Sequence, residues 1–244
     1  MSKSLKEIPV IVLCGGLGTR IQAVLKNRPK VLAPIGGSTL LDIIIGMFIK
    51  TGFEKIILSV GYLKEHIKEH IEKNNYRVIL SEEEEPLGTG GALKKALDYV
   101  GDARHFFVMN GDTVYRPNFA LLRTFHERRN ALMSMALTRR YVGSGGNVVI
   151  IDETKRVIGW RLKTEKDQPE ELPLNAGTYL FDSAVSKLLP KEQKFSLEND
   201  LFPTLWQHNC FGFETDDIFI DIGVPERYKM ANEMFENGLI KNYV

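Results

Sequence analysis

The chain has 244 residues, of which 43% are hydrophobic and 26% charged, enough for one large or two small packed domains. A formal net charge of +1 argues against a general nucleic-acid or membrane-surface binder, because such proteins carry an excess of Lys and Arg on one face. No apolar run approaches the roughly 20 residues that cross a bilayer, and the N-terminus lacks signal-peptide character, so we expect a cytoplasmic protein with reduced Cys14 and Cys210.

Strand and helix patterns alternate through the first half of the chain. Strands are predicted at 9–13, 55–60, 77–80 and 105–110, and helices at 63–74, 91–100 and 119–130. A further helix, apolar nearly all round, follows Ser38 as its N-cap and ends at Gly52. This alternation is typical of βαβ units, so the fold class is α/β, with a Rossmann-like, mainly parallel central sheet flanked by helices.

After about residue 131 the pattern changes to strands separated by turn residues. Strands are predicted at 132–138, 147–151, 156–163, 174–181, around 211 and at 218–221, with helices at 182–189, at 196–207 and from Pro225. This half is expected to be more antiparallel. Because no repeat, low-complexity segment or long linker separates the halves, we expect one domain over 1–244, with halves of about 1–130 and 131–244.

The glycine-rich turn after the first strand is a candidate phosphate loop. In "VIVLCGGLGTR", Gly15, Gly16 and Gly18 allow a tight turn that brings several backbone N–H groups to one anion. An ordinary βα turn would look the same, but it would not require the cations Arg20 and Lys30. Neither a P-loop nor a dinucleotide fingerprint fits this spacing.

The segment "EEEEPLGTGGAL", residues 82–93, joins an acidic run to a second glycine cluster. Four glutamates are most often a solvated loop. The cluster at Gly88, Gly90 and Gly91 favours a second interpretation, in which a base or ribose lies close against the backbone. Glu85 could then accept hydrogen bonds from a guanine edge.

Two carboxylates follow apolar strands directly. Asp112 comes after "VMNG" at the end of a strand, where open α/β sheets gather ligands, and Asp221 lies in "FIDIGVPERY" just before a helix. Asp112 is a candidate metal ligand that could equally be a turn or capping aspartate, and Asp221 would be its partner carboxylate.

Taken together, "LCGGLGTR", "RPK", "EEPLGTGGA", "NGDT", "LNAGTYLF" and "FIDIGVPERY" resemble the sugar-phosphate nucleotidylyltransferases. The resemblance covers nearly the whole chain. It implies the nucleotide-diphospho-sugar transferase fold, with a smaller antiparallel sugar-binding portion. It also implies Mg²⁺ as cofactor, and a nucleoside triphosphate and a sugar 1-phosphate as partners. Within the family, the D-glycero-D-manno-heptose 1-phosphate guanylyltransferases are most similar, with the mannose-1-phosphate guanylyltransferases nearby, which implies GTP and preferably D-glycero-D-manno-heptose 1-phosphate.

The same resemblance implies a role for each motif residue. The catalytic residues are Arg20, Lys30 and Asp112, and the Mg²⁺ ligands are Asp112 and Asp221. The nucleotide-binding residues are Leu13, Gly15, Gly16, Gly18, Thr19, Glu85, Gly88, Thr89 and Gly111. The sugar-phosphate-binding residues are Gly146, Lys163, Asn175, Gly177 and Glu198.

One strand departs from the family pattern. Where the family commonly has Glu-Lys, alignment on Trp160 places Leu162 in the Glu position, whereas another register would use Glu165 and Lys166. Two alternatives to a guanylyltransferase stay open: a uridylyl- or cytidylyltransferase acting on a hexose 1-phosphate, and a non-catalytic homologue. A homo-oligomer is compatible with the sequence.

Overall fold

The computed structural model describes residues 4–143, 146–164, 167 and 172–240. The helical segments are α1 (Gln22–Leu25), η1 (Lys30–Leu32), α2 (Leu40–Thr51), α3 (Lys64–Lys73), α4 (Gly88–Ala96), η2 (Leu97–Tyr99), α5 (Phe119–Arg128), η4 (Ser183–Leu188), η5 (Leu197–Leu201), α6 (Phe202–Leu205) and α7 (Pro225–Glu236). The strands are β1 (Val10–Leu13), β2 (Pro34–Ile35), β3 (Ser38–Thr39), β4 (Ile56–Val60), β5 (Ile79–Glu82), β6 (His105–Asn110), β7 (Thr113–Val114), β8 (Met133–Thr138), β9 (Asn147–Ile151), β10 (Val157–Leu162), β11 (Leu174–Asp182), β12 (Cys210–Thr215) and β13 (Ile220–Asp221).

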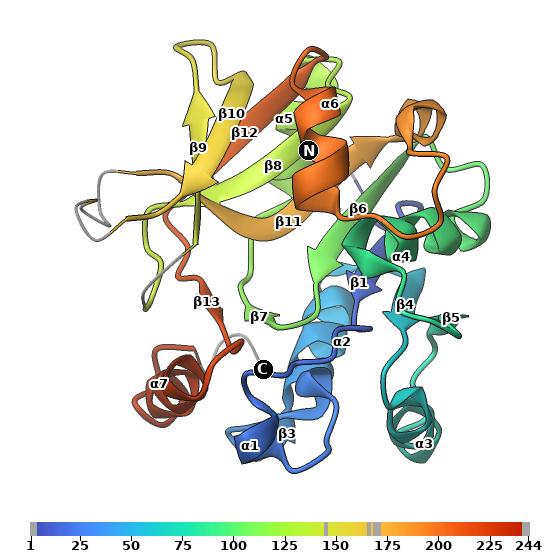
Figure 1. The fold of residues 1–244 in the computed structure, drawn as a ribbon, viewed down its shortest axis with the longest axis vertical. Coiled ribbons are helices and arrows are strands. Elements are labelled where there is room, and N and C mark those ends of the chain that lie inside the picture. The colour runs from blue at the N-terminus through green and yellow to red at the C-terminus, as the bar shows by residue number, and fades with distance from the viewer. Residues whose placement is uncertain (1–3, 144–145, 165–166, 168–171, 241–244) are drawn as a thin grey trace.

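One large sheet runs through the molecule in the order β10-β9-β11-β6-β1-β4-β5, with β8 beside β11 and β12 beside β8 (Figure 1). β1 lies between β4 and β6 and is parallel to both, and β5 continues the parallel part. β11 is antiparallel to β6 and to β8. The predicted α/β class with a mainly parallel central sheet is therefore confirmed, and strands from the second half extend the same sheet.

Two apolar cores cover the two faces of this sheet. Side chains of neighbouring residues on a strand point to opposite faces, so Val10 and Val12 join one core while Ile11 joins the other. The first core contains α2 and the inner side of α3, and the second contains α4 and α6, which lie in front of the sheet in Figure 1. Because both faces are covered, the β1 strand is apolar without interruption.

Helix α2 is capped one residue later than predicted. The hydroxyl of Thr39 accepts a hydrogen bond from the Asp42 backbone N–H, and the Asp42 carboxylate accepts one from the Thr39 backbone N–H. This reciprocal pair satisfies two N–H groups at the helix start, which Ser38 does not do. The Asp42 carboxylate also lies 2.7 Å from a ring nitrogen of His70, so it ties α2 to α3.

Helix α4 begins at Gly88, three residues before the predicted start at Gly91. The early backbone N–H groups of a helix need acceptors from outside the helix, and here those of Gly90 and Gly91 donate to the Phe195 carbonyl oxygen at 2.9 and 3.2 Å. A distant segment therefore completes this helix start. The predicted helix 196–207 is divided into the wide turn η5 and the short helix α6.

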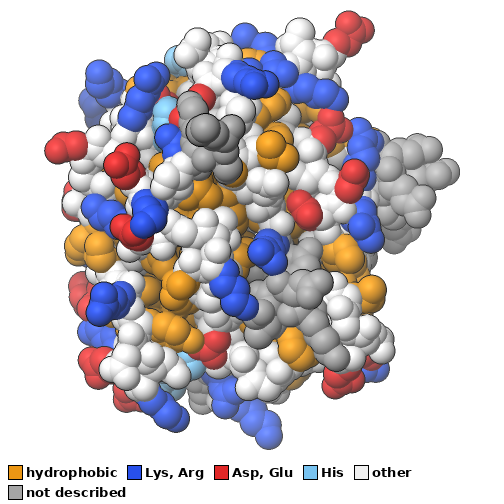
Figure 2. Space-filling model, turned by 180° about the vertical axis from the view of Figure 1, so that it is seen from behind, with side chains coloured by type: hydrophobic (Ala, Val, Ile, Leu, Met, Phe, Trp, Pro, Cys, Tyr) orange, Lys and Arg blue, Asp and Glu red, His pale blue; other side chains and the backbone are white. Residues whose placement is uncertain are grey.

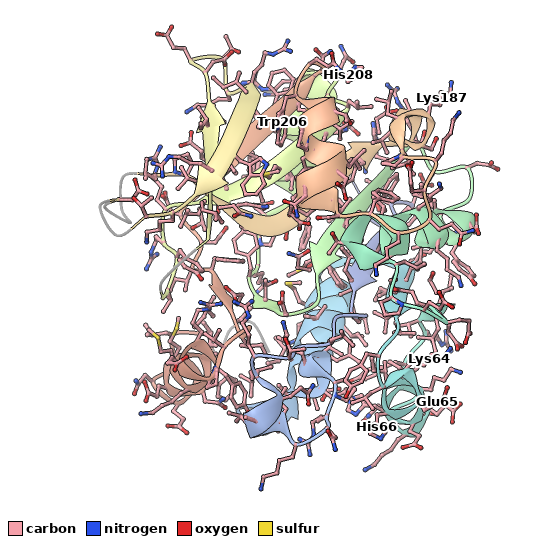
Figure 3. All side chains as sticks on the ribbon, viewed as in Figure 1. Lys64, Glu65, His66, Lys187, Trp206 and His208 are labelled. Carbon is pink, nitrogen blue, oxygen red and sulfur yellow. The ribbon has the colours of Figure 1, made fainter. Side chains whose placement is uncertain are left out.

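The surface carries charges of both signs. On the face seen in Figure 2, Lys and Arg side chains are interspersed with Asp and Glu, as the small net charge predicts. Trp206, which directly follows α6 and is labelled in Figure 3, packs against Phe202 with ring centroids 5.8 Å apart. Among the described residues, none of the helices combines the length and apolar character that a bilayer crossing requires.

Candidate functional site

The glycine-rich loop follows the central strand β1 at the carboxyl edge of the parallel sheet. The backbone N–H of Cys14 still bonds to Ser59, but those of residues 15–20 donate to no acceptor among the described residues. Gly18 has a left-handed φ of +59°, and a Cβ there would lie 3.4 Å from Cε of Lys30. The loop is therefore a row of unused N–H donors with a lysine stem packed on it, as an anion-binding turn requires.

A lysine and an aspartate meet at the open side of this loop. Lys30 is the first residue of η1, which follows the buried Pro29, and Asp112 follows β6. The Nζ of Lys30 lies 2.8 Å from Oδ2 of Asp112, and their side chains are 16% and 32% exposed. Two residues that the sequence singled out separately thus form one ion pair that ligands can reach.

Asp221 is placed beside Asp112 by a short antiparallel pair. β13 pairs with β7 so that Asp221 lies opposite Thr113, and the backbone N–H of Ile222 donates to the Asp112 carbonyl at 2.9 Å. Oδ1 of Asp221 accepts hydrogen bonds from Arg227 at 2.6 Å and from the Gly223 N–H at 2.9 Å. Its other oxygen, Oδ2, accepts one from the Tyr141 hydroxyl at 2.9 Å.

Asp112 and Asp221 could together bind a magnesium ion whose remaining ligands are water and phosphate oxygens. Oδ1 of Asp112 accepts no hydrogen bond from any described residue, and Oδ2 of Asp221 accepts the single bond from Tyr141. The described residues contain no cluster of three or more His, Cys, Asp or Glu side chains that could hold a metal alone. Mg²⁺ commonly uses one or two carboxylates together with water and phosphate oxygens, which matches this donor set.

A first cleft of about 350 Å³ opens between the glycine loop and the start of α4. The predicted residues Leu13, Gly15, Gly16, Lys30, Gly88, Thr89, Gly111 and Asp112 line it. Gly18 and Thr19 lie in the adjoining part of the loop, where Thr19 is exposed. One wall therefore offers backbone N–H groups and a cation, and the opposite wall is the beginning of a helix.

The carboxylate facing this cleft belongs to Glu83, which is not among the predicted site residues. Glu83 is 6% exposed, and its two oxygens accept hydrogen bonds from the Ser59 hydroxyl at 3.2 Å and the Leu87 N–H at 3.0 Å. A Cβ at Gly15 would lie 2.8 Å from Oε1 of Glu83, so a larger residue there would displace this carboxylate. Side chains two residues apart on a strand point to the same side, so the buried Ser81 could have indicated that Glu83 is buried too. This signal was missed because the strand was predicted to end at residue 80, whereas β5 ends at Glu82.

The other glutamates of the acidic run do not line the first cleft. Glu85 is exposed and lines a smaller neighbouring pocket, which also contains Glu83 and Pro86. Glu84 pairs at 2.8 Å with Lys64, which Figure 3 labels on α3. The acidic run is therefore a segment that is ion-paired to α3, and Glu83 is its one buried carboxylate.

The interpretation of the second glycine cluster as a ligand surface is wrong for Gly90 and Gly91. A Cβ at Gly90 would lie 2.2 Å from the Phe195 ring, and one at Gly91 would lie 2.1 Å from the Gln193 carbonyl oxygen. These glycines are needed because another part of the chain packs against them. Gly88 is packed in the same way, since a Cβ there would lie 2.6 Å from the Phe195 carbonyl oxygen, but it also lines the first cleft.

A second cleft of about 690 Å³ adjoins the first, and both are lined by Asn110 and Asp112. The predicted residues Arg20, Gly146, Asn175, Gly177, Glu198 and Asp221 line it. Asn175 bridges a bulge in β11, because its side chain accepts from the Gly177 N–H at 2.9 Å and donates to the Tyr179 hydroxyl at 2.9 Å. The second cleft thus gathers carboxylate, amide and guanidinium groups around one wide opening.

Lys163 is placed at the rim of the second cleft by its backbone. Its N–H donates to the Gly146 carbonyl at 3.0 Å, while the cleft itself is lined by Leu162, whose side chain is 69% exposed. The alternative pair Glu165 and Lys166 lies outside the described residues. Leu162 thus lines the second cleft, and which of the two registers supplies the family's Glu position stays a prediction.

Comparison with known proteins finds similarity along almost the whole chain. A family model described as nucleotidyl transferase matches residues 9–238. D-glycero-alpha-D-manno-heptose 1-phosphate guanylyltransferase of Campylobacter jejuni is 34% identical over 89% of this chain and 96% of its own length. The enzyme of that name from Aneurinibacillus thermoaerophilus is 33% identical over 93% and 98%. The crystal structure of HddC from Yersinia pseudotuberculosis complexed with GMP-PN has a TM-score of 0.78 and 32% identity, covering 93% of this chain and 99% of that one.

Proposed function

Because this chain belongs to the nucleotidyl transferase family, we propose that it joins a nucleoside triphosphate to a sugar 1-phosphate and releases pyrophosphate. We propose GTP and D-glycero-D-manno-heptose 1-phosphate as the preferred pair. The observation that carries the proposal is the meeting of two clefts at Asn110 and Asp112. One cleft has a loop of unused N–H donors suited to phosphates, and the other has acceptor groups suited to sugar hydroxyls.

In this reaction a phosphate oxygen of the sugar 1-phosphate attacks the α-phosphorus, and the bond to the β-phosphate oxygen breaks. The attacking phosphate needs no general base, because its second pKa is about 6 and it is largely dianionic at neutral pH. The difficulty is the mutual repulsion of the phosphates, so the protein must position them and neutralise charge.

We propose for these residues the roles that the family resemblance implies. The N–H groups of the loop from Gly15 to Thr19 would hold the triphosphate, and Lys30 would contact the attacking and α-phosphates. Arg20 would stabilise the departing pyrophosphate, and Lys163 would bind the sugar phosphate. Asp112 and Asp221 would hold Mg²⁺, which would supply positive charge to neutralise the phosphates.

Glu83 supports guanine as the base. Guanine presents two adjacent donors, N1–H and N2–H, to a pair of carboxylate oxygens, whereas uracil presents one N–H between two carbonyl oxygens that a carboxylate would repel. Each oxygen of Glu83 has one hydrogen bond from the protein, which leaves lone pairs for a ligand. A wrong base would leave these two buried oxygens without hydrogen-bond donors, and the resulting loss of binding energy discriminates strongly against that base.

The test is a pyrophosphate-release assay that crosses four nucleoside triphosphates with a panel of sugar 1-phosphates. We expect turnover with GTP and the heptose 1-phosphate. If no pair releases pyrophosphate, the chain is a non-catalytic homologue. A preference for UTP or CTP with a hexose 1-phosphate would establish the other alternative.

Two paired variants test how the base is read. Glu83→Gln replaces one acceptor by a donor, so the ratio of kcat/KM for GTP over UTP should fall about 10-fold or more. Glu85→Gln should leave that ratio within about two-fold, since Glu85 is exposed outside the first cleft. The opposite pattern would move the base-reading role to Glu85.

A further inference from the structure

One hydrogen bond links the two clefts directly. Thr89 lies in the first turn of α4 and lines the first cleft, while Glu198 lies in the first turn of η5 and lines the second. The Thr89 hydroxyl donates to Oε2 of Glu198 at 2.9 Å, across 109 positions of sequence. A side chain at the wall of one cleft therefore holds a side chain at the wall of the other.

The hydroxyl of Thr89 has no proton left for a nucleotide. It has a single O–H, which is used on Glu198, and its oxygen accepts a hydrogen bond from the Leu197 N–H at 2.9 Å. Phosphate oxygens only accept hydrogen bonds, so Thr89 cannot serve them without releasing Glu198. The location of Thr89 in the first cleft is thus misleading about what it does.

The two oxygens of Glu198 have different surroundings. Oε2 accepts from Thr89 at 2.9 Å and from the Ser196 hydroxyl at 3.0 Å. Oε1 accepts no hydrogen bond from any residue that the structure describes. One oxygen is held and the other is available to a donor in the second cleft. An available carboxylate oxygen suits a hydroxyl group and repels a phosphate.

The backbone around Glu198 is held to α4 as well. The Phe195 carbonyl accepts the N–H groups of Gly90 and Gly91, and the Phe195 N–H donates to the Leu87 carbonyl at 3.0 Å. These bonds dock the chain just before Glu198 onto the start of α4, and the Thr89 hydroxyl then fixes the direction of the carboxylate.

We propose that Thr89 is a positioning residue for the sugar 1-phosphate, which acts by orienting Glu198 so that Oε1 accepts a hydrogen bond from a sugar hydroxyl. This inference rests on the proposed function, because it takes the second cleft as the sugar-phosphate cleft. It reassigns Thr89 from nucleotide binding to sugar recognition.

The experiment compares Thr89→Val with Thr89→Ser. Valine keeps the branched shape and loses the hydroxyl, whereas serine keeps the hydroxyl. We expect Thr89→Val to raise KM for the sugar 1-phosphate about 10-fold, the scale of one lost hydrogen bond to a charged group. KM for the nucleoside triphosphate should stay within about two-fold, and Thr89→Ser should restore the sugar KM to within about two-fold of wild type. An increase confined to the nucleotide KM would overturn the proposal.

Crystal structures of the two variants make the outcome independent of turnover. In Thr89→Val the Glu198 carboxylate should rotate away or adopt several conformers, while in Thr89→Ser it should keep the observed position. An unmoved carboxylate in Thr89→Val would refute the positioning role. Failure of the proposed function has a different signature, since wild-type protein would then release pyrophosphate from no substrate pair.

Discussion

The Lys30–Asp112 pair gives the sharpest prediction about catalysis. Lys30→Met removes the charge and keeps an apolar stem of similar length, so the contact with Gly18 should persist. Because the two side chains are only 16% and 32% exposed, solvent screens their attraction incompletely, and its loss should cost about 1–2 kcal/mol of folding stability. The catalytic loss should be much larger, since the Asp112 carboxylate would face the incoming phosphates without its counter-ion.

A single charge contact made in the transition state is worth about 2.7–4 kcal/mol, which corresponds to a fall in kcat/KM of about 10²- to 10³-fold. Initial rates of pyrophosphate release measure this fall, and a thermal melt monitors the fold. Lys26→Met is the matched control, because Lys26 is an exposed lysine that lines neither cleft. If Lys30→Met keeps kcat/KM within about three-fold of wild type, the proposed role of this lysine is refuted.

Three further predictions concern the metal, the packing and the pH response. Asp221→Asn should raise the Mg²⁺ concentration for half-maximal rate about 10-fold or more, and it should lower the melting temperature because Arg227 loses its charged partner; an unchanged Mg²⁺ titration would contradict the role of Asp221 as a ligand. Gly91→Ala places a methyl group against the Gln193 carbonyl and should cost about 1–3 kcal/mol in denaturant unfolding, so a neutral effect would show that this contact relaxes freely. Burial lowers the pKa of His126 from 6.5 to about 3. Between these two pH values the imidazole is protonated in the unfolded chain but neutral in the native state. Stability should therefore fall below pH 6.5, by about 2 kcal/mol at pH 5, and His126→Gln should remove most of this loss.

Much of the fold follows from local sequence patterns. Continuous apolar runs such as the one at β1 predict strands covered on both faces, and the alternation with helices predicts parallel pairing. Helix α2 has its stop at Gly52, as predicted, because a left-handed residue ends the helix there. These elements were predictable because the signals are short-range and repeat along the chain.

The sequence alone also located most residues of the candidate site. Glycines after a strand, and an aspartate at the end of another, mark the carboxyl edge of a parallel sheet whichever partners they later meet. The loop donors, Lys30, Asp112 and Asp221 all lie around the two adjoining clefts. Their roles in turnover stay predictions that the variants above would test.

The direction of individual side chains was decided by tertiary structure. Four consecutive glutamates are chemically identical, and only the packing of Glu83 against Gly15 and Ser59 selects the one that faces the first cleft. Likewise, Gly90 and Gly91 face Phe195 and Gln193 rather than a ligand.

By itself, then, the sequence determined the α/β architecture and the strand ends where ligands gather, because backbone propensity and apolar period act over a few residues. Which oxygen, hydroxyl or glycine faces a substrate was decided only on folding. The residues whose contacts fix these directions are far apart in the sequence, as Thr89 and Glu198 are, at a separation of 109 positions. A local sequence pattern therefore cannot predict such contacts.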